Sequence, residues 1–138
     1  MDTQLIRKHK TLNPYESKFG YSRSVRRGPF IFVSGTTAIS TTGKVLYPAS
    51  AHQQALKIFD EIIDAVEALD GKKEDVVRVR MFVTRDEDAE DVGRALKEVF
   101  EDVEPAATMI LGVKFVNEEM RVEIEADAVV FWWVAMLP

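Results

Sequence analysis

Cysteine is absent from this chain of 138 residues. Its absence excludes disulfide bonds, thiol catalysis and metal sites with cysteine ligands. Histidine is scarce as well, since only His9 and His52 occur, and neither belongs to a motif with metal-ligand spacing. We therefore expect no metal site and no cofactor.

Long apolar runs and an excess of positive charge are also missing. No segment approaches the roughly 18 apolar residues that a membrane-spanning helix needs. Residues 1–12 are polar and basic, unlike a secretory signal, so we expect a cytoplasmic protein without membrane contact. The chain has 18 Lys and Arg against 23 Asp and Glu, a net charge of −5. This balance disfavours a protein whose main task is binding nucleic-acid phosphates.

The length predicts a single domain over residues 1–138, with one hydrophobic core. No internal repeat or low-complexity linker divides the sequence. Residues 1–14 are predicted to form a flexible arm. Residues 131–138 are strongly apolar but too short to cross a membrane. We expect this tail to pack against another surface, and another subunit is one candidate.

The apolar periodicity predicts two helices and five strands in the order β-β-α-β-α-β-β. Ser50 and Gln53 fit a capping box at the start of a helix over 51–69, which carries an apolar stripe. A second helix over 86–103 opens with three acidic residues, which suit the positive end of a helix dipole. This order predicts an α+β fold with both helices on one face of a mixed sheet. The predicted strands span 19–26, 29–35, 75–84, 107–115 and 120–131.

Charged residues gather on one face of two of these strands, 75–84 and 120–131. Arginines alternate with apolar residues in the first, and carboxylates do so in the second. If the two strands are neighbours, these charges can pair across them. The apolar faces are predicted to hold Val77, Val79, Met81 and Val83 in the first strand and Val122, Ile124, Ala126, Ala128 and Val130 in the second. The opposite faces are predicted to hold Val76, Arg78, Arg80 and Phe82, and Arg121, Glu123, Glu125 and Asp127.

The charged face also receives aromatic residues. Phe30, Phe32 and Phe82 fall on it, and such side chains are poorly suited to contact with water. An apolar patch rimmed by charge is typical of an association surface. We therefore expect other copies of the chain to cover this face.

Three short motifs resemble those of the RidA family, also called YjgF or L-PSP. They are Val33-Ser34-Gly35, Pro105-Ala106 and Val122-Glu123-Ile124-Glu125-Ala126, and the resemblance covers nearly the whole chain from Tyr15 onward. It implies the β-β-α-β-α-β-β fold that this family shares with bacterial chorismate mutase. It also implies a homotrimer whose sheets line a central barrel, with small-molecule clefts between subunits.

The best-studied members of that family hydrolyse imines or enamines derived from amino acids, and they release a 2-oxo acid and ammonia. By this resemblance, Glu123 takes the place of the glutamate that orients the attacking water. Tyr21 and the Ser34-Gly35 step take the place of residues that shape the pocket.

Two positions depart from the pattern that the resemblance implies. The arginine that clamps the substrate carboxylate falls on Ala107, and an asparagine of the second helix falls on Gly93. A charge-assisted hydrogen bond is worth roughly 1.5–3 kcal/mol, and alanine supplies none. Standard deamination of 2-iminopropanoate is therefore predicted to be weakened by orders of magnitude.

Several alternatives stay open at the candidate site. Arg23, Arg78 or Arg80 could replace the missing arginine, or the pocket could take a larger or less acidic ligand. Thr108 could donate a hydrogen bond to a ligand or serve only in a turn. Glu123 could orient water, or it could simply pair with one of the sheet arginines.

Two main hypotheses about function follow. The first is a hydrolase or deaminase that acts on a reactive imine or enamine in an intersubunit cleft. The second is a non-catalytic module that binds or senses a metabolite in the same cleft. An endoribonuclease is a minor alternative, because two isolated histidines and a net charge of −5 do not assemble a ribonuclease site.

Overall fold

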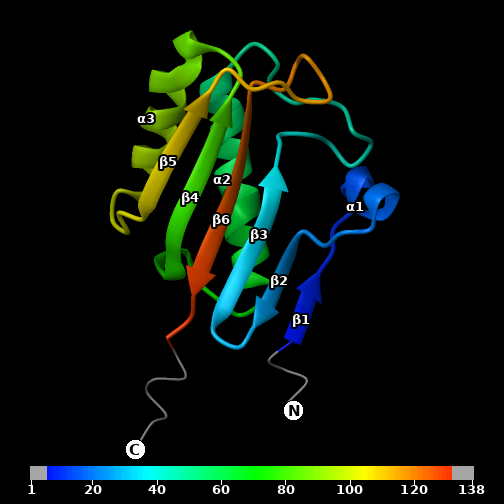
Figure 1. Cartoon of the computed structure of the whole chain (residues 1–138), viewed down its shortest axis with the longest axis vertical. Coiled ribbons are helices and arrows are strands. Elements are labelled where there is room, and N and C mark those ends of the chain that lie inside the picture. The colour runs from blue at the N-terminus through cyan, green and yellow to red at the C-terminus, as the bar shows by residue number, and fades with distance from the viewer. Residues whose placement is uncertain (1–5, 132–138) are drawn as a thin grey trace, which may run out of the picture.

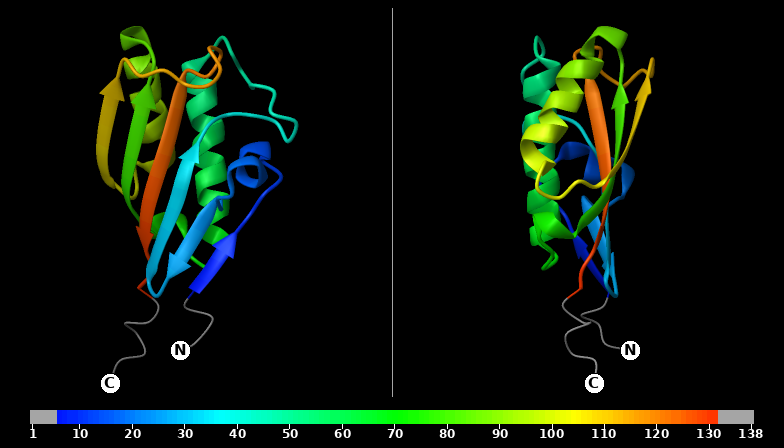
Figure 2. Two further views of the ribbon diagram at one scale, coloured as in Figure 1. Left: turned by 45° about the vertical axis from the view of Figure 1, so that its right-hand side comes forward. Right: turned by 90° about the vertical axis from the view of Figure 1, so that its left-hand side faces the viewer.

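The computed structural model describes residues 6–131, which build one six-stranded sheet with two long helices on one face (Figure 1). Seen edge-on, the helices and the sheet form two layers (Figure 2). The strands are β1 (Ile6–His9), β2 (Ser24–Arg27), β3 (Phe30–Thr36), β4 (Val76–Val83), β5 (Ala106–Leu111) and β6 (Val122–Val129). The helices are α1 (Pro14–Phe19), α2 (Ala51–Glu67) and α3 (Ala89–Phe100), with short 3₁₀ turns η2 (Lys73–Asp75) and η3 (Asp86–Asp88).

The sheet is mixed, as the sequence predicts. Its strand order is β1-β2-β3-β6-β4-β5, and only β4 and β5 run parallel. The last strand, β6, lies between β3 and β4 at the centre of the sheet. The two strands with alternating charges are therefore neighbours, and Arg80 lies opposite Glu125. The α+β fold and the helices on one face are confirmed.

The helix α2 covers the sheet with the apolar stripe that its sequence predicts. Ser50 caps its start by accepting a hydrogen bond from the backbone amide of Gln53 at 3.1 Å. Phe59 of this helix meets Phe100 of α3 edge-to-face, with ring centres 5.4 Å apart. The fully buried stripe residues are Ala55, Ile58, Phe59, Ile62 and Val66, and they pack in one cluster with Ile31, Val79 and Ile124 of the sheet.

The prediction of a flexible arm over 1–14 is wrong for residues 6–14. Ile6–His9 forms the edge strand β1, which pairs antiparallel with β2. Asn13 then caps α1 by accepting a hydrogen bond from the amide of Tyr15 at 2.9 Å, and Pro14 occupies the first turn. A four-residue strand and a six-residue helix are too short to show a clear apolar period, so the sequence pattern did not reveal them. Residues 1–5 lie outside the described part of the chain.

The predicted strand over 19–26 is also shorter than expected. Phe19 is the last residue of α1, which ends at Gly20 with a left-handed φ of 75°. Only Ser24–Arg27 pairs as a strand.

A β-bulge in β4 overturns two predicted side-chain directions. Val76 lies opposite Ala128 and Arg78 opposite Asp127, so two steps along β4 match one step along β6. Val77 is the extra residue. Val76 is therefore buried with 2% exposure, while Val77 is 40% exposed, the reverse of the predicted assignment.

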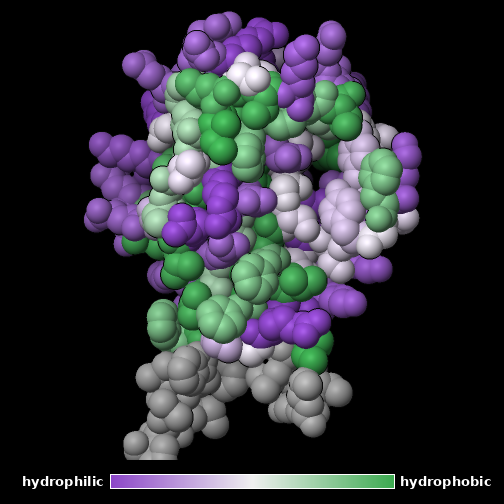
Figure 3. Space-filling view, viewed as in Figure 1, coloured by the Kyte–Doolittle hydropathy of each residue, from purple (hydrophilic) through white to green (hydrophobic). Residues whose placement is uncertain are grey.

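Among residues 6–131, no segment covers the sheet face opposite the helices, and we call this face the open face. Figure 3 shows a charged belt across its middle with apolar side chains on both sides. Phe30 and Phe32 are 49% and 45% exposed there. Of the predicted apolar tail, Phe131 is exposed, and residues 132–138 lie outside the described part of the chain. No helix within residues 6–131 is long and apolar enough to cross a membrane.

Candidate functional site

Glu123 and Gly35 meet where the central strands β6 and β3 run side by side. A Cβ atom placed on Gly35 would lie 3.0 Å from Cδ and 3.1 Å from Oε1 of Glu123. The carboxylate therefore lies directly against the backbone of β3, in space that only glycine leaves free. Two of the predicted site residues are thus brought into contact.

The carboxylate of Glu123 has no ion pair and no hydrogen bond among residues 6–131. The sheet arginine nearest in register, Arg80, instead places Nη1 3.3 Å from Oε1 of Glu125 and 3.3 Å from Oδ2 of Asp127. Register sets Phe82 opposite Glu123. Within residues 6–131, Glu123 therefore does not form the ion pair with a sheet arginine that the sequence left open as an alternative.

Burial raises the pKa of the Glu123 carboxyl above its usual value. The positive charge of Arg23 opposes this effect, and the negative charge of Glu125 adds to it. A carboxylate that is partly withdrawn from water, and that has no cation bonded to it, is a stronger base than a solvated one. It is suited to hold and deprotonate a water molecule.

Arg23 is 3% exposed and is held on every side by its own chain. Its Nε donates to Oε2 of Glu16 at 3.0 Å, and its Nη1 donates to the carbonyl of Gly35 at 2.8 Å and to Oγ1 of Thr36 at 2.9 Å. Its Nη2 reaches the hydroxyl of Tyr21 at 3.4 Å. Arg23 therefore fixes the backbone under Glu123 and is not free to clamp a ligand.

Glu16 anchors this network from α1. Burial by itself would raise the pKa of its carboxyl. Hydrogen bonds from Thr11 and Arg23 outweigh that effect and lower the pKa below its usual value. The ion pair between Glu16 and Arg23 is thus buried, and through the hydrogen bond from Arg23 to the carbonyl of Gly35 it links α1 to β3.

A pocket of about 300 Å³ opens beside Glu123, at the small end of the range for ligand clefts. Figure 3 shows the molecule hollowed between the sheet and α1. The predicted residues Tyr21, Gly35 and Glu123 line it. The other lining residues come from the segment around α1, from the loop between β5 and β6, and from the end of β3: Asn13, Tyr15, Phe19, Thr37, Lys114, Phe115, Val116 and Met120.

Sequence reasoning missed the α1 and loop residues of this pocket. The helix α1 was not predicted, although Asn13-Pro14 is a helix-start signal that could have revealed it. The loop has no periodicity. A small second core of Ile39, Val45 and Met120, with Tyr15 and Phe115 packed on it, holds α1 and the loop in place.

Ser34 does not reach this pocket. Its hydroxyl donates to the carbonyl of Ser22 at 2.7 Å, and its amide donates to the carbonyl of Arg23 at 2.9 Å. This residue therefore ties β3 to the chain before β2, and its hydroxyl is engaged with the backbone.

The predicted ligand residues Ala107 and Thr108 lie on the edge strand β5, and β4 separates them from β6. Both are exposed. Arg78 lies opposite Ala106 and makes no ion pair within the described residues. The candidate site thus divides into two groups, one around Glu123 and one along β5, and among residues 6–131 the β5 group does not line the Glu123 pocket.

Two further features bear on other chemistries. A second cavity, of about 240 Å³, lies between β1 and α2 and is lined by His9, Arg23, Glu61 and other residues. Asn13 lines both cavities, but Tyr21, Gly35 and Glu123 do not line this one. His52 contacts Glu98 at 3.1 Å on the surface. Across residues 6–131, no three His, Asp or Glu side chains cluster in a way that could hold a metal ion.

Comparisons with known proteins agree with this architecture. The sequence profile described as "Endoribonuclease L-PSP" matches residues 11–130. An uncharacterized protein of Streptomyces coelicolor is 30% identical over 129 residues, which cover 93% of this chain and 95% of that protein. A protein of Dermatophagoides farinae named 2-iminobutanoate/2-iminopropanoate deaminase is 28% identical over 110 residues, which cover 80% and 85%.

Solved structures show the same likeness. A Mycobacterium tuberculosis member of the YjgF/YER057c/UK114 family superposes with a TM-score of 0.81 at 30% identity, covering 91% of this chain and 99% of that one. The YjgF gene product of E. coli superposes with a TM-score of 0.75 at 28% identity, covering 89% and 98%.

Proposed function

Because the chain belongs to the Endoribonuclease L-PSP family, also called the RidA or YjgF family, we propose that it hydrolyses a reactive imine or enamine in the Glu123 pocket. The observation that supports this best is the carboxylate of Glu123, which lies against Gly35 and has no bonded cation within the described chain. The deaminase name of the Dermatophagoides farinae relative points to the same reaction class.

In this proposal the chemistry is carried by Glu123 and one water molecule. Glu123 accepts a proton from the water while the water oxygen bonds to the carbon of the protonated imine, whose carbon–nitrogen π electrons move to the nitrogen, and this gives a neutral carbinolamine. The protonated carboxyl then delivers its proton to the nitrogen and the carbon–nitrogen bond breaks. As the carbonyl forms, the hydroxyl proton passes to the departing ammonia, which leaves as ammonium, and Glu123 is again a carboxylate. A raised pKa suits a group with both roles, because a pKa closer to the working pH balances proton uptake against proton release.

The proposed substrate is not the standard short-chain imino acid. Ala107 supplies no guanidinium, and neither of the two engaged arginines replaces it, since Arg23 is buried in its own network and Arg80 is paired with carboxylates. Arg78 does not line the pocket.

We also propose that the chain acts as a homotrimer whose subunits join the two groups of site residues. The exposed rings of Phe30 and Phe32 on the open face support an association surface there. The separation of Ala107 and Thr108 from Glu123 supports a cleft completed by a second chain. A cytoplasmic location stays a prediction from the sequence.

A non-catalytic metabolite-binding module is the second candidate, and the alanine at position 107 favours it. An endoribonuclease, the activity in the family's description, is a weaker candidate, because neither histidine lines the Glu123 pocket and the net charge is −5.

One experiment separates hydrolysis from binding alone. Imines are generated in situ from amino acids, and their decay is followed with the wild-type protein, Glu123→Gln and Glu125→Gln. We expect wild-type acceleration to fall at least 100-fold in Glu123→Gln. The control Glu125→Gln, two residues along the same strand face, should keep most of the activity. Wild-type protein without any acceleration across short and long imines would refute hydrolysis and leave the binding module.

A further inference from the structure

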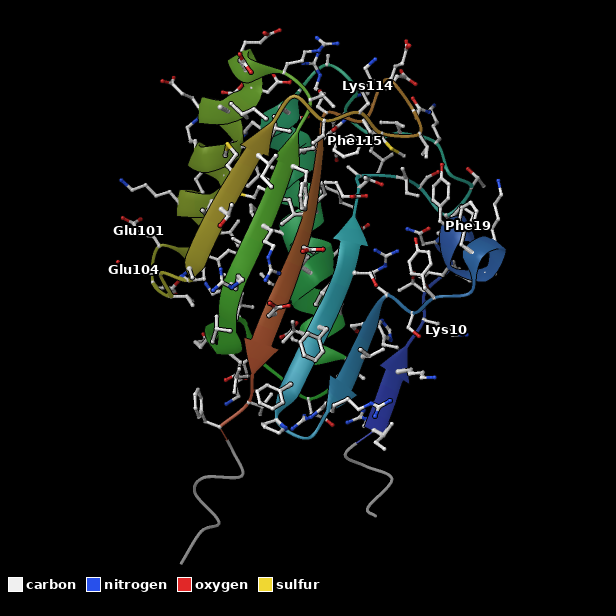
Figure 4. The ribbon with its side chains drawn as sticks, viewed as in Figure 1. Lys10, Phe19, Glu101, Glu104, Lys114 and Phe115 are labelled. Carbon is white, nitrogen blue, oxygen red and sulfur yellow. The ribbon has the colours of Figure 1, made fainter. Side chains whose placement is uncertain are left out.

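The Glu123 pocket has apolar walls that no part of the chemistry above uses. Tyr15 and Phe19 of α1 lie with their rings parallel, 3° between planes and 6.3 Å between centres. Phe115 and Val116 come from the loop between β5 and β6. Figure 4 shows Phe115 at the upper end of the sheet and Phe19 on α1, which lies to the right of the sheet.

Some of these walls are fixed and some are left in water. Tyr15 and Phe115 are partly buried on the small second core, so the pocket is formed before any ligand arrives. Phe19 is 66% exposed and Val116 is 81% exposed at the mouth. Such side chains gain stability when an apolar group covers them, in proportion to the area removed from water.

Lys114 is the cation that lines this pocket. It is exposed and makes no ion pair or hydrogen bond among the described residues, so its ammonium group is available. Its long flexible stem lets the charge reach a ligand at the pocket mouth. The arginines nearby are already engaged, as Arg23 is by Glu16 and Arg80 is by Glu125.

We infer that the Glu123 pocket selects an anionic ligand with a bulky apolar, preferably aromatic, side chain, whose acidic group binds Lys114. This deepens the proposed function, on which it rests, by naming the substrate class. A 2-imino acid derived from an aromatic amino acid has both features. Its carboxylate meets Lys114, its ring covers Phe19 and Val116, and its imine carbon faces Glu123.

A short imino acid satisfies only half of this arrangement. It offers the carboxylate but leaves the aromatic walls in contact with water. A neutral aromatic molecule offers the ring but leaves Lys114 without a partner. The pocket therefore discriminates by the sum of the two contacts, and both single-feature ligands should bind more weakly than the ligand that combines them.

Stable analogues test the inference without turnover. Binding of phenylpyruvate, pyruvate and phenylacetone to the full-length protein is measured by calorimetry. We expect phenylpyruvate to bind at least tenfold more tightly than either of the others. Lys114→Met should weaken phenylpyruvate at least tenfold and leave phenylacetone unchanged. Phe19→Ala should weaken phenylpyruvate and leave pyruvate unchanged.

Lys10→Met is the matched control, since Lys10 is an exposed lysine just after β1, away from the loop that carries Lys114 (Figure 4), and does not line the pocket. Its affinities should equal those of the wild type. Lys114 and Phe19 are exposed, so both variants are expected to fold, and thermal unfolding checks this. Equal affinity for pyruvate and phenylpyruvate, or an unchanged Kd in Lys114→Met, would overturn the inference.

The outcomes also separate this inference from the proposed reaction. The predicted binding pattern without imine hydrolysis would support the ligand class and refute the hydrolase. Hydrolysis of short imines without a preference for phenylpyruvate would support the hydrolase and overturn the ligand class. A lower solution mass of Phe19→Ala with unchanged affinity would assign that ring to subunit contact and also overturn the inference.

Discussion

At the scale of single residues, the site depends on a carboxylate that is withdrawn from water without a bonded partner. Gly35 has no side chain, and this leaves the space that the carboxylate of Glu123 occupies. Arg23 does not bond to this carboxylate, because its guanidinium donates to Glu16, to a backbone carbonyl and to two hydroxyls. Ionising such a group costs stability, because burial penalises its charged form. The charge that suits Glu123 to catalysis therefore weakens the fold.

This cost predicts a pH dependence for Glu123→Gln. The folded-state pKa of Glu123 is raised, so its protonated form stabilises the fold, and that contribution is lost as pH rises through the raised pKa. At neutral pH the glutamine variant should therefore be more stable than the wild type. The difference should shrink as pH falls toward and below the ordinary glutamate pKa of about 4.3. Urea unfolding across this range measures it.

The same carboxyl should set the acid limb of the activity profile. Its basic form is needed, so kcat/KM should fall as pH decreases, with an apparent pKa above the ordinary value of about 4.3. In the unfolding experiment, the raised pKa of Glu123 would be contradicted if the wild type were less stable than Glu123→Gln at low pH and this difference in stability decreased toward neutral pH.

At the scale of elements, the short helix α1 matters more than its length suggests. It carries Tyr15 and Phe19 into the pocket, and one buried ion pair, Glu16 with Arg23, ties it to the sheet. A six-residue helix has little stability of its own. The position of the pocket wall therefore depends on this tie and on the small second core.

Removing the ion pair between Glu16 and Arg23 should lower the free energy of unfolding by a large amount. Glu16→Gln leaves the Arg23 charge buried and unpaired, which typically costs about 3–5 kcal/mol. Asp91→Asn is the control, because its partner Arg94 is exposed and such surface pairs are worth about 0–1 kcal/mol. Urea denaturation at neutral pH compares the two. Equal losses in both variants would show that the buried pair does not hold α1.

Acidification should also remove the stability that the Glu16–Arg23 ion pair contributes to the wild type. The pKa of Glu16 is lowered in the folded chain, so its contribution to stability is present above the unfolded-state pKa and is lost as pH falls through the lowered value. The advantage of the wild type over Glu16→Gln should therefore decrease in strong acid.

At the scale of the whole molecule, the open face and the divided site favour the same conclusion. Phe30 and Phe32 leave apolar area in water, and the β5 group lies apart from Glu123. A second chain that covers this face would bury the rings and could bring the two groups together.

The trimer is tested by the solution mass. At micromolar concentration we expect three times the chain mass of 15.6 kDa by light scattering. Phe32→Asp should reduce the mass, because it places a charge in the apolar contact. The control Leu12→Asp should not, since Leu12 is 78% exposed but lines the cavity beside α2, on the helix side of the sheet. A monomeric wild type would refute both the trimer and the intersubunit cleft.

The sequence by itself determined the parts of this protein that depend on local period and on short motifs. The stripe of α2, the alternation in β6 and two helices on one face of a mixed sheet were predicted, because burial repeats every 3.6 residues in a helix and every two in a strand. The family motifs singled out Glu123 and Gly35 separately, and the pairing of β3 with β6 brings them into contact.

Only the tertiary structure decided which side chains are free to act. The bulge at Val77, the pairing of Arg80 with Glu125, and the isolation of Glu123 depend on strand register, which neighbouring residues along the chain do not encode. The pocket walls come from α1 and a loop, whose positions are set by a small core of distant residues. Local pattern therefore specified the scaffold, and contacts between distant segments specified the chemistry that it can support.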